Sequence, residues 1–140
     1  MLIVVDTSVF VSACLGTGAS SAVVAVCLSG DHTPLIGSAL LAEYEDVLGR
    51  ADLFRDCRLT GAEREELFDI FLAVCRWTRI YFSWRPNLRD EGDNHLVELA
   101  VAGGAERIVT RNLRDLKGME LKFPGLVAVT PEQFLKEVKS

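Results

Sequence analysis

The chain has 140 residues, of which 49% are hydrophobic and 25% charged, so it is the size of one domain and can bury a core. This is a globular composition, and we expect a single domain over residues 1–140. The net charge of −5 argues against a protein that binds nucleic acid through bulk positive charge, although it does not exclude a nuclease with local basic strips.

Neither a membrane segment nor a disulfide framework is indicated. No apolar run reaches the roughly 18 residues that a membrane helix needs, and the start of the chain lacks the basic region of a secretory signal. We therefore expect a cytoplasmic protein that spans no membrane. The cysteines form neither a CxxC nor a Cys/His zinc pattern, so we expect four reduced core thiols: Cys14, Cys27, Cys57 and Cys75.

The first predicted element is a strand over residues 2–5, because Leu-Ile-Val-Val is the kind of apolar run that forms a buried parallel strand. Asp6 follows at its carboxyl end, which is the edge where ligands bind in open α/β sheets. With the hydroxyls of Thr7 and Ser8 it can hold a hydrated cation. A strand-end aspartate can equally begin a turn or cap a helix. The choice therefore depends on acids elsewhere in the chain.

A helix is predicted over residues 20–28, capped by Ser20 or Ser21 and ended by Gly30. A short strand around residues 34–36 then leads into a helix over residues 39–48. Glu43 lies on that helix at the border of its apolar stripe. The stripe consists of Leu40, Tyr44, Val47 and Leu48.

Thr60 and Glu63 form a capping box that opens an amphipathic helix to about Cys75. Its predicted inward stripe is Leu67, Ile70, Phe71 and Val74. Residues 76–89 contain four arginines, four aromatics and no acid. Their alternation predicts a strand, and Arg85 and Arg89 are candidates for contact with RNA.

Asp93 stands at the start of a predicted helix, where its negative charge also suits the helix dipole. This helix ends at residues 103–104. Strands follow over residues 107–110 and 127–129, and Pro131 opens the last helix. Strands separated by helices predict an α/β fold with a parallel sheet between helix layers. Asp115 comes just past a predicted strand, on the same edge of the sheet as Asp6.

Four acids can thus converge on one cleft: Asp6, Glu43, Asp93 and Asp115. Carboxylates brought together in a partly desolvated cleft repel one another, and a divalent cation removes that conflict. Mg²⁺ or Mn²⁺ suits carboxylate oxygens, whereas no His or Cys set suits zinc. The chemistry that such a site supports is metal-assisted hydrolysis of a phosphodiester.

Residues 3–10, 41–48, 90–100 and 108–116 resemble the four acidic motifs of PIN-domain proteins, in order and in spacing. The resemblance extends to residues 129–135. Within that superfamily the chain is similar to the toxin components of toxin–antitoxin systems, relatives of the VapC-type ribonuclease toxins. It implies a three-layer α/β/α sandwich with a mainly parallel sheet of about five strands.

The resemblance also implies roles for individual residues. The metal-binding and catalytic carboxylates would be Asp6, Glu43, Asp93 and Asp115, with Asp90 as a further candidate ligand. Thr7, Ser8, Thr110 and Asn112 would support them. Many relatives have an additional acid where this chain has Asn112. Because that acid is replaced here, the expected number of ions is one or two. His95 and Glu98 are expected on the exposed side of their helix.

The implied function is an Mg²⁺- or Mn²⁺-dependent endoribonuclease that acts on single-stranded RNA. The implied partners are an RNA bound by Arg85, Arg89 and Arg111, a small antitoxin, and a second copy in a homodimer. Phe68, Phe71 and Leu72 give the helix after Thr60 more apolar surface than one face needs.

Two other functions stay open. The first is a PIN fold kept as an RNA-binding or protein-interaction module without turnover. The second is a receiver-like phosphoacceptor, which needs an acidic pair after its first strand and a lysine after its last. This chain has Asp-Thr-Ser at residues 6–8 and Val-Thr-Pro at residues 129–131, so the receiver is the weaker interpretation.

Overall fold

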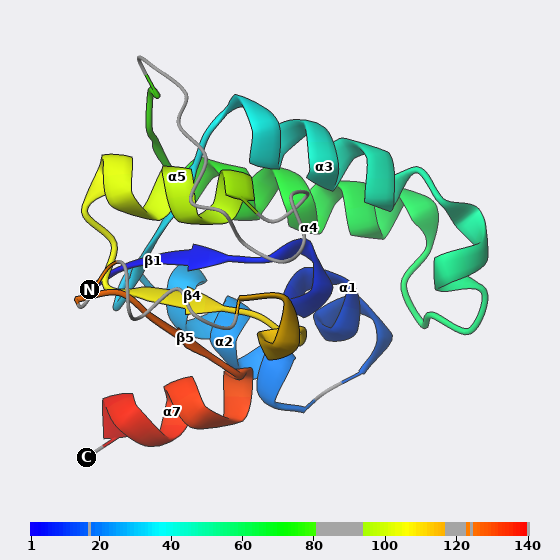
Figure 1. Cartoon of the computed structure of the whole chain (residues 1–140). Coiled ribbons are helices and arrows are strands. Elements are labelled where there is room, and N and C mark those ends of the chain that lie inside the picture. The colour runs from blue at the N-terminus through cyan, green and yellow to red at the C-terminus, as the bar shows by residue number, and fades with distance from the viewer. Residues whose placement is uncertain (17, 81–93, 117–122, 124, 140) are drawn as a thin grey trace.

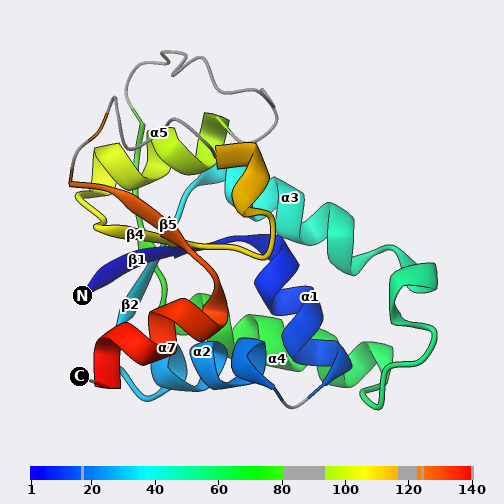
Figure 2. The same cartoon turned by 60° about the horizontal axis from the view of Figure 1, so that its bottom comes forward.

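The computed structural model describes residues 1–16, 18–80, 94–116, 123 and 125–139. Within these residues five strands form one sheet in the order β3-β2-β1-β4-β5, and all of their pairings are parallel. Helices cover both faces (Figure 1). α3 and α5 lie on one face, and α2 lies between α4 and α7 on the other, as the turned view also shows (Figure 2). The predicted three-layer sandwich is confirmed.

The strands are β1 (Leu2–Val5), β2 (Thr33–Ile36), β3 (Arg76–Trp77), β4 (Arg107–Val109) and β5 (Val127–Val129). β1 lies in the centre and is buried because both its neighbours and both helix layers cover it. Val5 is paired with Val109. The next residues, Asp6 and Thr110, therefore leave the sheet side by side at its carboxyl edge.

The helices are α1 (Thr7–Leu15), α2 (Ala19–Leu28), α3 (Ser38–Leu48), η1 (Ala51–Phe54), α4 (Gly61–Val74), α5 (Asn94–Gly103), η3 (Leu113–Leu116) and α7 (Pro131–Lys139). The capping box of Thr60 and Glu63 is confirmed. α2 begins after Gly18 with no side-chain cap, so neither predicted serine caps it. α1 was not expected, because apolar residues surround nearly its whole circumference and no periodic stripe marks it.

Two predictions for the middle of the chain are wrong. α4 turns Phe68 and Phe71 into the core and leaves Ile70 48% exposed, although Ile70 was assigned to the inward stripe. The predicted strand over residues 76–89 is limited, among the described residues, to Arg76–Trp77. Residues 78–80 continue without strand structure, and the rest of that segment lies outside the described residues.

An aromatic cluster explains how α4 is oriented. The ring of Phe10, on α1, has its centroid 5.7 Å from that of Tyr44, 5.8 Å from that of Phe68 and 5.4 Å from that of Phe71. Tyr44 and Phe68 stack with centroids 5.2 Å apart. These contacts fix α1, α3 and α4 against one another, and they select Phe68 over Ile70 as the buried position.

All four cysteines are free thiols, as expected. Cys14 and Cys27 are buried, whereas Cys57 and Cys75 are only half-buried. Burial raises the pKa of Cys27 to about 12. It likewise raises the pKa of Cys75 to about 12 and, with the nearby Cys57, that of Cys14 to about 11.

The raised thiol pKa of Cys27 predicts a loss of stability in alkali. The thiol ionises near pH 8.5 in the unfolded chain and near 12 in the folded one. The free energy of unfolding should therefore be constant below about pH 8.5 and then fall by up to about 1.4 kcal/mol per pH unit for this group. Urea unfolding at pH 8 and pH 10 measures the slope. A slope that Cys27→Ala leaves unchanged would contradict this assignment.

Among the described residues no single helix is long and apolar enough to cross a membrane. α1 and α2 meet the length and composition criteria only when they are taken together as a bent pair.

Candidate functional site

Asp6 stands at the carboxyl end of β1 and precedes α1. It occupies the N-cap position of α1, but its side chain makes no capping hydrogen bond. Its backbone N–H donates to the Val109 carbonyl at 3.0 Å, which continues the β1–β4 ladder. The residue is 5% exposed. The Asp6 carboxylate therefore lies buried at the sheet edge without capping the helix.

Two hydroxyls hold one oxygen of this carboxylate. Ser8 Oγ donates to Asp6 Oδ2 at 2.8 Å, and Thr110 Oγ1 donates to the same oxygen at 2.7 Å. Each hydroxyl accepts in turn from a backbone N–H, that of Arg111 at 3.1 Å and that of Asn112 at 3.0 Å. Because each hydroxyl accepts from a backbone N–H, its own proton is directed toward Asp6 Oδ2.

The second oxygen of Asp6 has no such support. Thr7 Oγ1 lies 3.5 Å from Asp6 Oδ1 but 2.8 Å from Glu43 Oε1, and its single proton goes to the closer acceptor. Thr7 thus places the carboxylates of Asp6 and Glu43 on either side of one hydroxyl. Asp6 Oδ1 stays available to an additional ligand.

Glu43 comes from the middle of α3. The next residue, Tyr44, is buried and donates to the Val5 carbonyl at 2.8 Å, which ties α3 to the end of β1. Glu43 Oε2 lies 2.6 Å from His95 Nε2. The hydrogen bond from His95 holds the pKa of Glu43 below its usual value, and the Thr7 hydroxyl adds to this against the opposing effect of burial. Glu43 is therefore a carboxylate at neutral pH.

His95 is a site residue that the sequence patterns missed. It was expected on the exposed side of its helix, but it contacts Glu43, and Glu98 is only 8% exposed. The reason is that α5 packs against both the sheet and α3, so more than one of its faces is covered. The sequence feature that could have identified His95 as a site residue is its position two residues after the predicted ligand Asp93.

Several predicted site residues lie outside the described residues: Arg85, Arg89, Asp90 and Asp93. Asp115 belongs to η3, but its side chain is also outside what the structure describes. Among the described side chains no three His, Cys, Asp or Glu residues form a group that could hold a metal. The structure thus brings together Asp6 and Glu43, and the four-carboxylate site stays a prediction.

Arg111 and Asn112 follow Thr110 at the same edge. The guanidinium of Arg111 contacts the Ser20 hydroxyl at 2.8 Å and pairs with Glu132 at 2.5 Å. It therefore links the sheet edge to α2 and α7, and its side chain stays 35% exposed. Asn112 is exposed and contributes its backbone N–H to the Thr110 hydroxyl.

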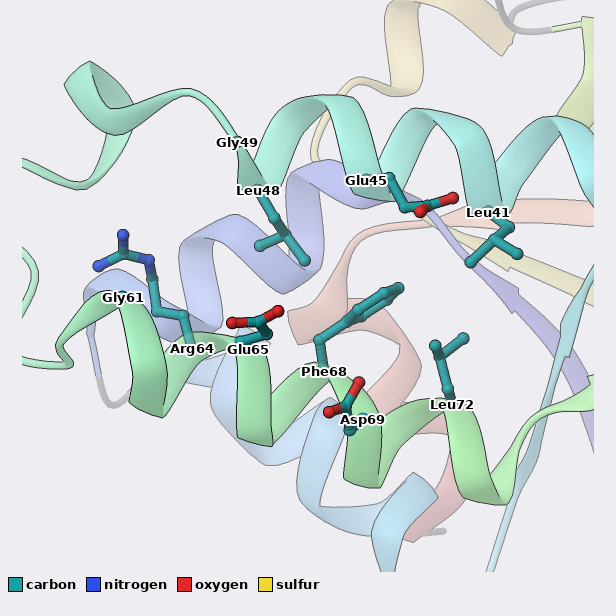
Figure 3. Close-up of a pocket in the computed structure, with 10 residues that line it drawn as sticks. All are labelled: Leu41, Glu45, Leu48, Gly49, Gly61, Arg64, Glu65, Phe68, Asp69 and Leu72. Carbon is teal, nitrogen blue, oxygen red and sulfur yellow. The ribbon is translucent and has the colours of Figure 1, made fainter.

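A hollow of about 560 Å³ lies between α3 and α4. Leu41 and Leu48 of α3 face Phe68 and Leu72 of α4 across it (Figure 3). Acids stand at its sides, but none of its lining residues belongs to the Asp6 network. The chemistry of Asp6 and Glu43 is therefore placed elsewhere, at the sheet edge.

The donor set at that edge fits a hard divalent cation. It consists of two carboxylates and three hydroxyls, and Asp6 is a buried residue with no hydroxyl committed to its Oδ1. Mg²⁺ and Mn²⁺ prefer such oxygen ligands. His95 already contacts Glu43, so it does not supply a nitrogen ligand for zinc there.

Comparison with known protein families matches residues 2–114 to the PIN domain, a span that includes Asp6, Glu43 and Asp93. The chain belongs to the PIN-domain family. Proteins with PIN domains are generally nucleases that use divalent metals. The predicted family is thereby confirmed, and the receiver interpretation is dropped.

Among solved structures, the chain is similar to a chain of VapBC2 from Rickettsia felis, crystallised bound to a DNA fragment from their promoter. The TM-score is 0.58 at 16% sequence identity, over 93% of this chain and 98% of that one. At this identity the match shows a shared fold. No curated protein matches the chain significantly.

Proposed function

We propose that this PIN-domain protein is a metal-dependent endoribonuclease that hydrolyses single-stranded RNA and serves as the toxin of a toxin–antitoxin pair. The observation that carries the proposal is the buried Asp6 carboxylate, which is fixed through Oδ2 by two hydroxyls and left open at Oδ1 beside Glu43. A carboxylate held in this way is preorganised for a cation.

In the proposed mechanism the protein mainly positions groups. Asp6 and Glu43 would hold Mg²⁺ or Mn²⁺, and Asp93 and Asp115 would complete the set, with Asp90 as a further candidate. The ion, when bound, would supply an activated water and would stabilise charge on the phosphate. Ser8 and Thr110 keep the Asp6 carboxylate from rotating, and the hydrogen bond from His95 lowers the pKa of Glu43 and holds its Oε2. Whether one or two ions bind depends on how well Asn112 replaces an acid.

Metal binding should stabilise the fold, because an ion that binds only the native state shifts the unfolding equilibrium. At about one hundred times its dissociation constant, Mn²⁺ should add about 2.7 kcal/mol to the free energy of unfolding. Thermal melts with and without millimolar Mn²⁺ measure this. Asp6→Asn should remove most of the shift, whereas Asp46→Asn, on the exposed side of α3, should keep it. An equal shift in Asp6→Asn would contradict the assignment.

The RNA should also be bound through basic residues, whose loss should spare metal binding. Changing Arg85, Arg89 or Arg111 to alanine should weaken binding and reduce the slope of log affinity against log salt by about one per lost phosphate contact. Arg111→Ala should also lower stability, because that side chain links Ser20 to Glu132. Arg50→Ala, which pairs with Asp46 on an exposed face, is the matched control. A slope that no variant changes would argue against these contacts.

The direct test of the function is RNA cleavage by purified protein, freed of any antitoxin, with Mg²⁺ or Mn²⁺ and a varied set of sequences. Cleavage that EDTA abolishes supports the proposal. The alternative is a PIN module without turnover, which is favoured by the fact that both oxygens of Glu43 already accept hydrogen bonds. Absence of cleavage with either metal would make that alternative the better one.

The proposed partners are a small antitoxin and a second copy of the chain. The expectation of a homodimer rested partly on Phe68 and Phe71, which the structure places in the core. Exposed Ile70 and half-buried Leu72 remain on the surface of α4. The dimer therefore stays a prediction with less apolar surface behind it than the sequence suggested.

A further inference from the structure

A second hollow, of about 340 Å³, opens near the candidate site. Its lining includes Ser38 and Ala39 after β2, Trp77 and Arg79 at and after the end of β3, and Glu98 of α5. β2 and β3 are the parallel strands next in order from β1, so the hollow lies at the same carboxyl edge as Asp6. Two strand spacings put it about 10 Å from the end of β1.

The feature that calls for a ligand is Glu98. The residue is 8% exposed, and its Oε1 atom is fully buried and has no hydrogen-bond partner within the part of the chain that the structure describes. Buried polar atoms are almost always paired, because an unpaired one loses its hydration without compensation. Glu98 lies one helical turn from His95, which contacts Glu43. A ligand that donates an N–H to Glu98 would therefore lie beside the proposed catalytic groups.

The other lining groups indicate the class of ligand. Trp77 is 54% exposed and offers an aromatic face, and Arg79 supplies an exposed positive charge. α3 begins at Ser38 with no side-chain cap, so its first backbone N–H groups can receive an anion. Of the described lining residues Glu98 is the single acid, and Arg79 carries an opposing positive charge, so a bound cation is disfavoured. A flat base with N–H donors, attached to phosphate, satisfies all these groups.

We propose that this hollow binds one base of the RNA beside the scissile bond and prefers guanine, an inference that rests on the proposed ribonuclease function. Guanine presents two neighbouring donors, N1–H and the 2-amino group, to a single carboxylate. Each of the other bases presents one donor group on that edge. Glu98 accepts these donors, Trp77 stacks on the ring, and Arg79 and the start of α3 receive phosphate.

The test measures binding without metal or turnover, so its outcome does not depend on cleavage. Fluorescent hexamers of uridine, with one position changed to guanosine or inosine, are titrated in EDTA by anisotropy. The guanosine hexamer should bind roughly tenfold more tightly than oligouridine, and inosine, which lacks the 2-amino group, should lose part of this. Glu98→Gln should abolish the preference, and Glu66→Gln, an exposed acid on α4, should keep it.

Three results would overturn the proposal: no preference in the wild-type protein, a preference that survives Glu98→Gln, or equal binding of inosine and uridine hexamers. The inosine comparison decides the matter on the wild-type chain if Glu98→Gln does not fold. Trp77→Ala, at an exposed position, should weaken all hexamers about equally. Guanosine monophosphate that binds as tightly as the hexamer would indicate a free nucleotide and overturn the assignment to an RNA base.

Discussion

Asp6→Asn is expected to reduce RNA cleavage at least about a thousandfold while the protein stays folded. An asparagine can place its carbonyl oxygen where Oδ2 accepts from Ser8 and Thr110. Its NH₂ group then occupies the position of Oδ1, where a donor repels the cation that a carboxylate attracts. The network therefore survives, whereas the charge that holds the metal is lost.

The rate should be measured with enzyme in excess over RNA, so that product release does not limit it. Asp93→Asn should behave in the same way if that residue completes the site. Asp69→Asn is a suitable control, because Asp69 is an exposed acid on α4 away from the network, and it should cleave within about twofold of the wild type. An Asp6→Asn rate within tenfold of the wild type would remove Asp6 from the mechanism.

Phe10→Ala is expected to lower the free energy of unfolding by about 3–5 kcal/mol. Phe10 is fully buried, and its ring contacts those of Tyr44, Phe68 and Phe71. Truncation removes the transfer free energy of the ring and leaves a cavity, because three surrounding elements cannot all collapse into it. Tm should fall by more than ten degrees.

Urea unfolding followed by circular dichroism measures this change. Ile70→Ala provides the comparison on α4, since its side chain is 48% exposed, and it should cost about 1 kcal/mol or less. A loss below about 1 kcal/mol for Phe10→Ala would mean that the aromatic cluster does not organise the core.

β1, β2, β4 and β5 and the placement of Asp6 were predictable from local sequence, whereas the extent of β3 was not. β1 is an unbroken apolar run, and such a run at the start of an alternating strand–helix pattern places the following residue at the carboxyl edge. Glu43 could be placed because α3 has a clear stripe that it borders. The register that pairs Val5 with Val109 then brings Thr110 to Asp6, as the motif order suggested.

The contacts of α5 and α4 were not predictable in this way. Sequence periodicity shows one apolar face, but α5 packs against both the sheet and α3, so its polar residues His95 and Glu98 are also enclosed. On α4, Phe68 and Ile70 are both apolar, and the choice between them depends on rings from α1 and α3. Such choices are made by tertiary packing between segments distant in sequence.

The central claim is that a metal-activated water hydrolyses the RNA. It is tested most directly by following the oxygen atom of that water into the product. RNA is cleaved by the antitoxin-free protein in ¹⁸O-labelled water with Mn²⁺ or Mg²⁺, and the products are weighed by mass spectrometry. Hydrolysis by a metal-activated water predicts one ¹⁸O in the new terminal phosphate, no 2′,3′-cyclic phosphate, and no product with EDTA or with Asp6→Asn. Cyclic phosphate ends, or cleavage that continues without metal, would contradict the proposed mechanism.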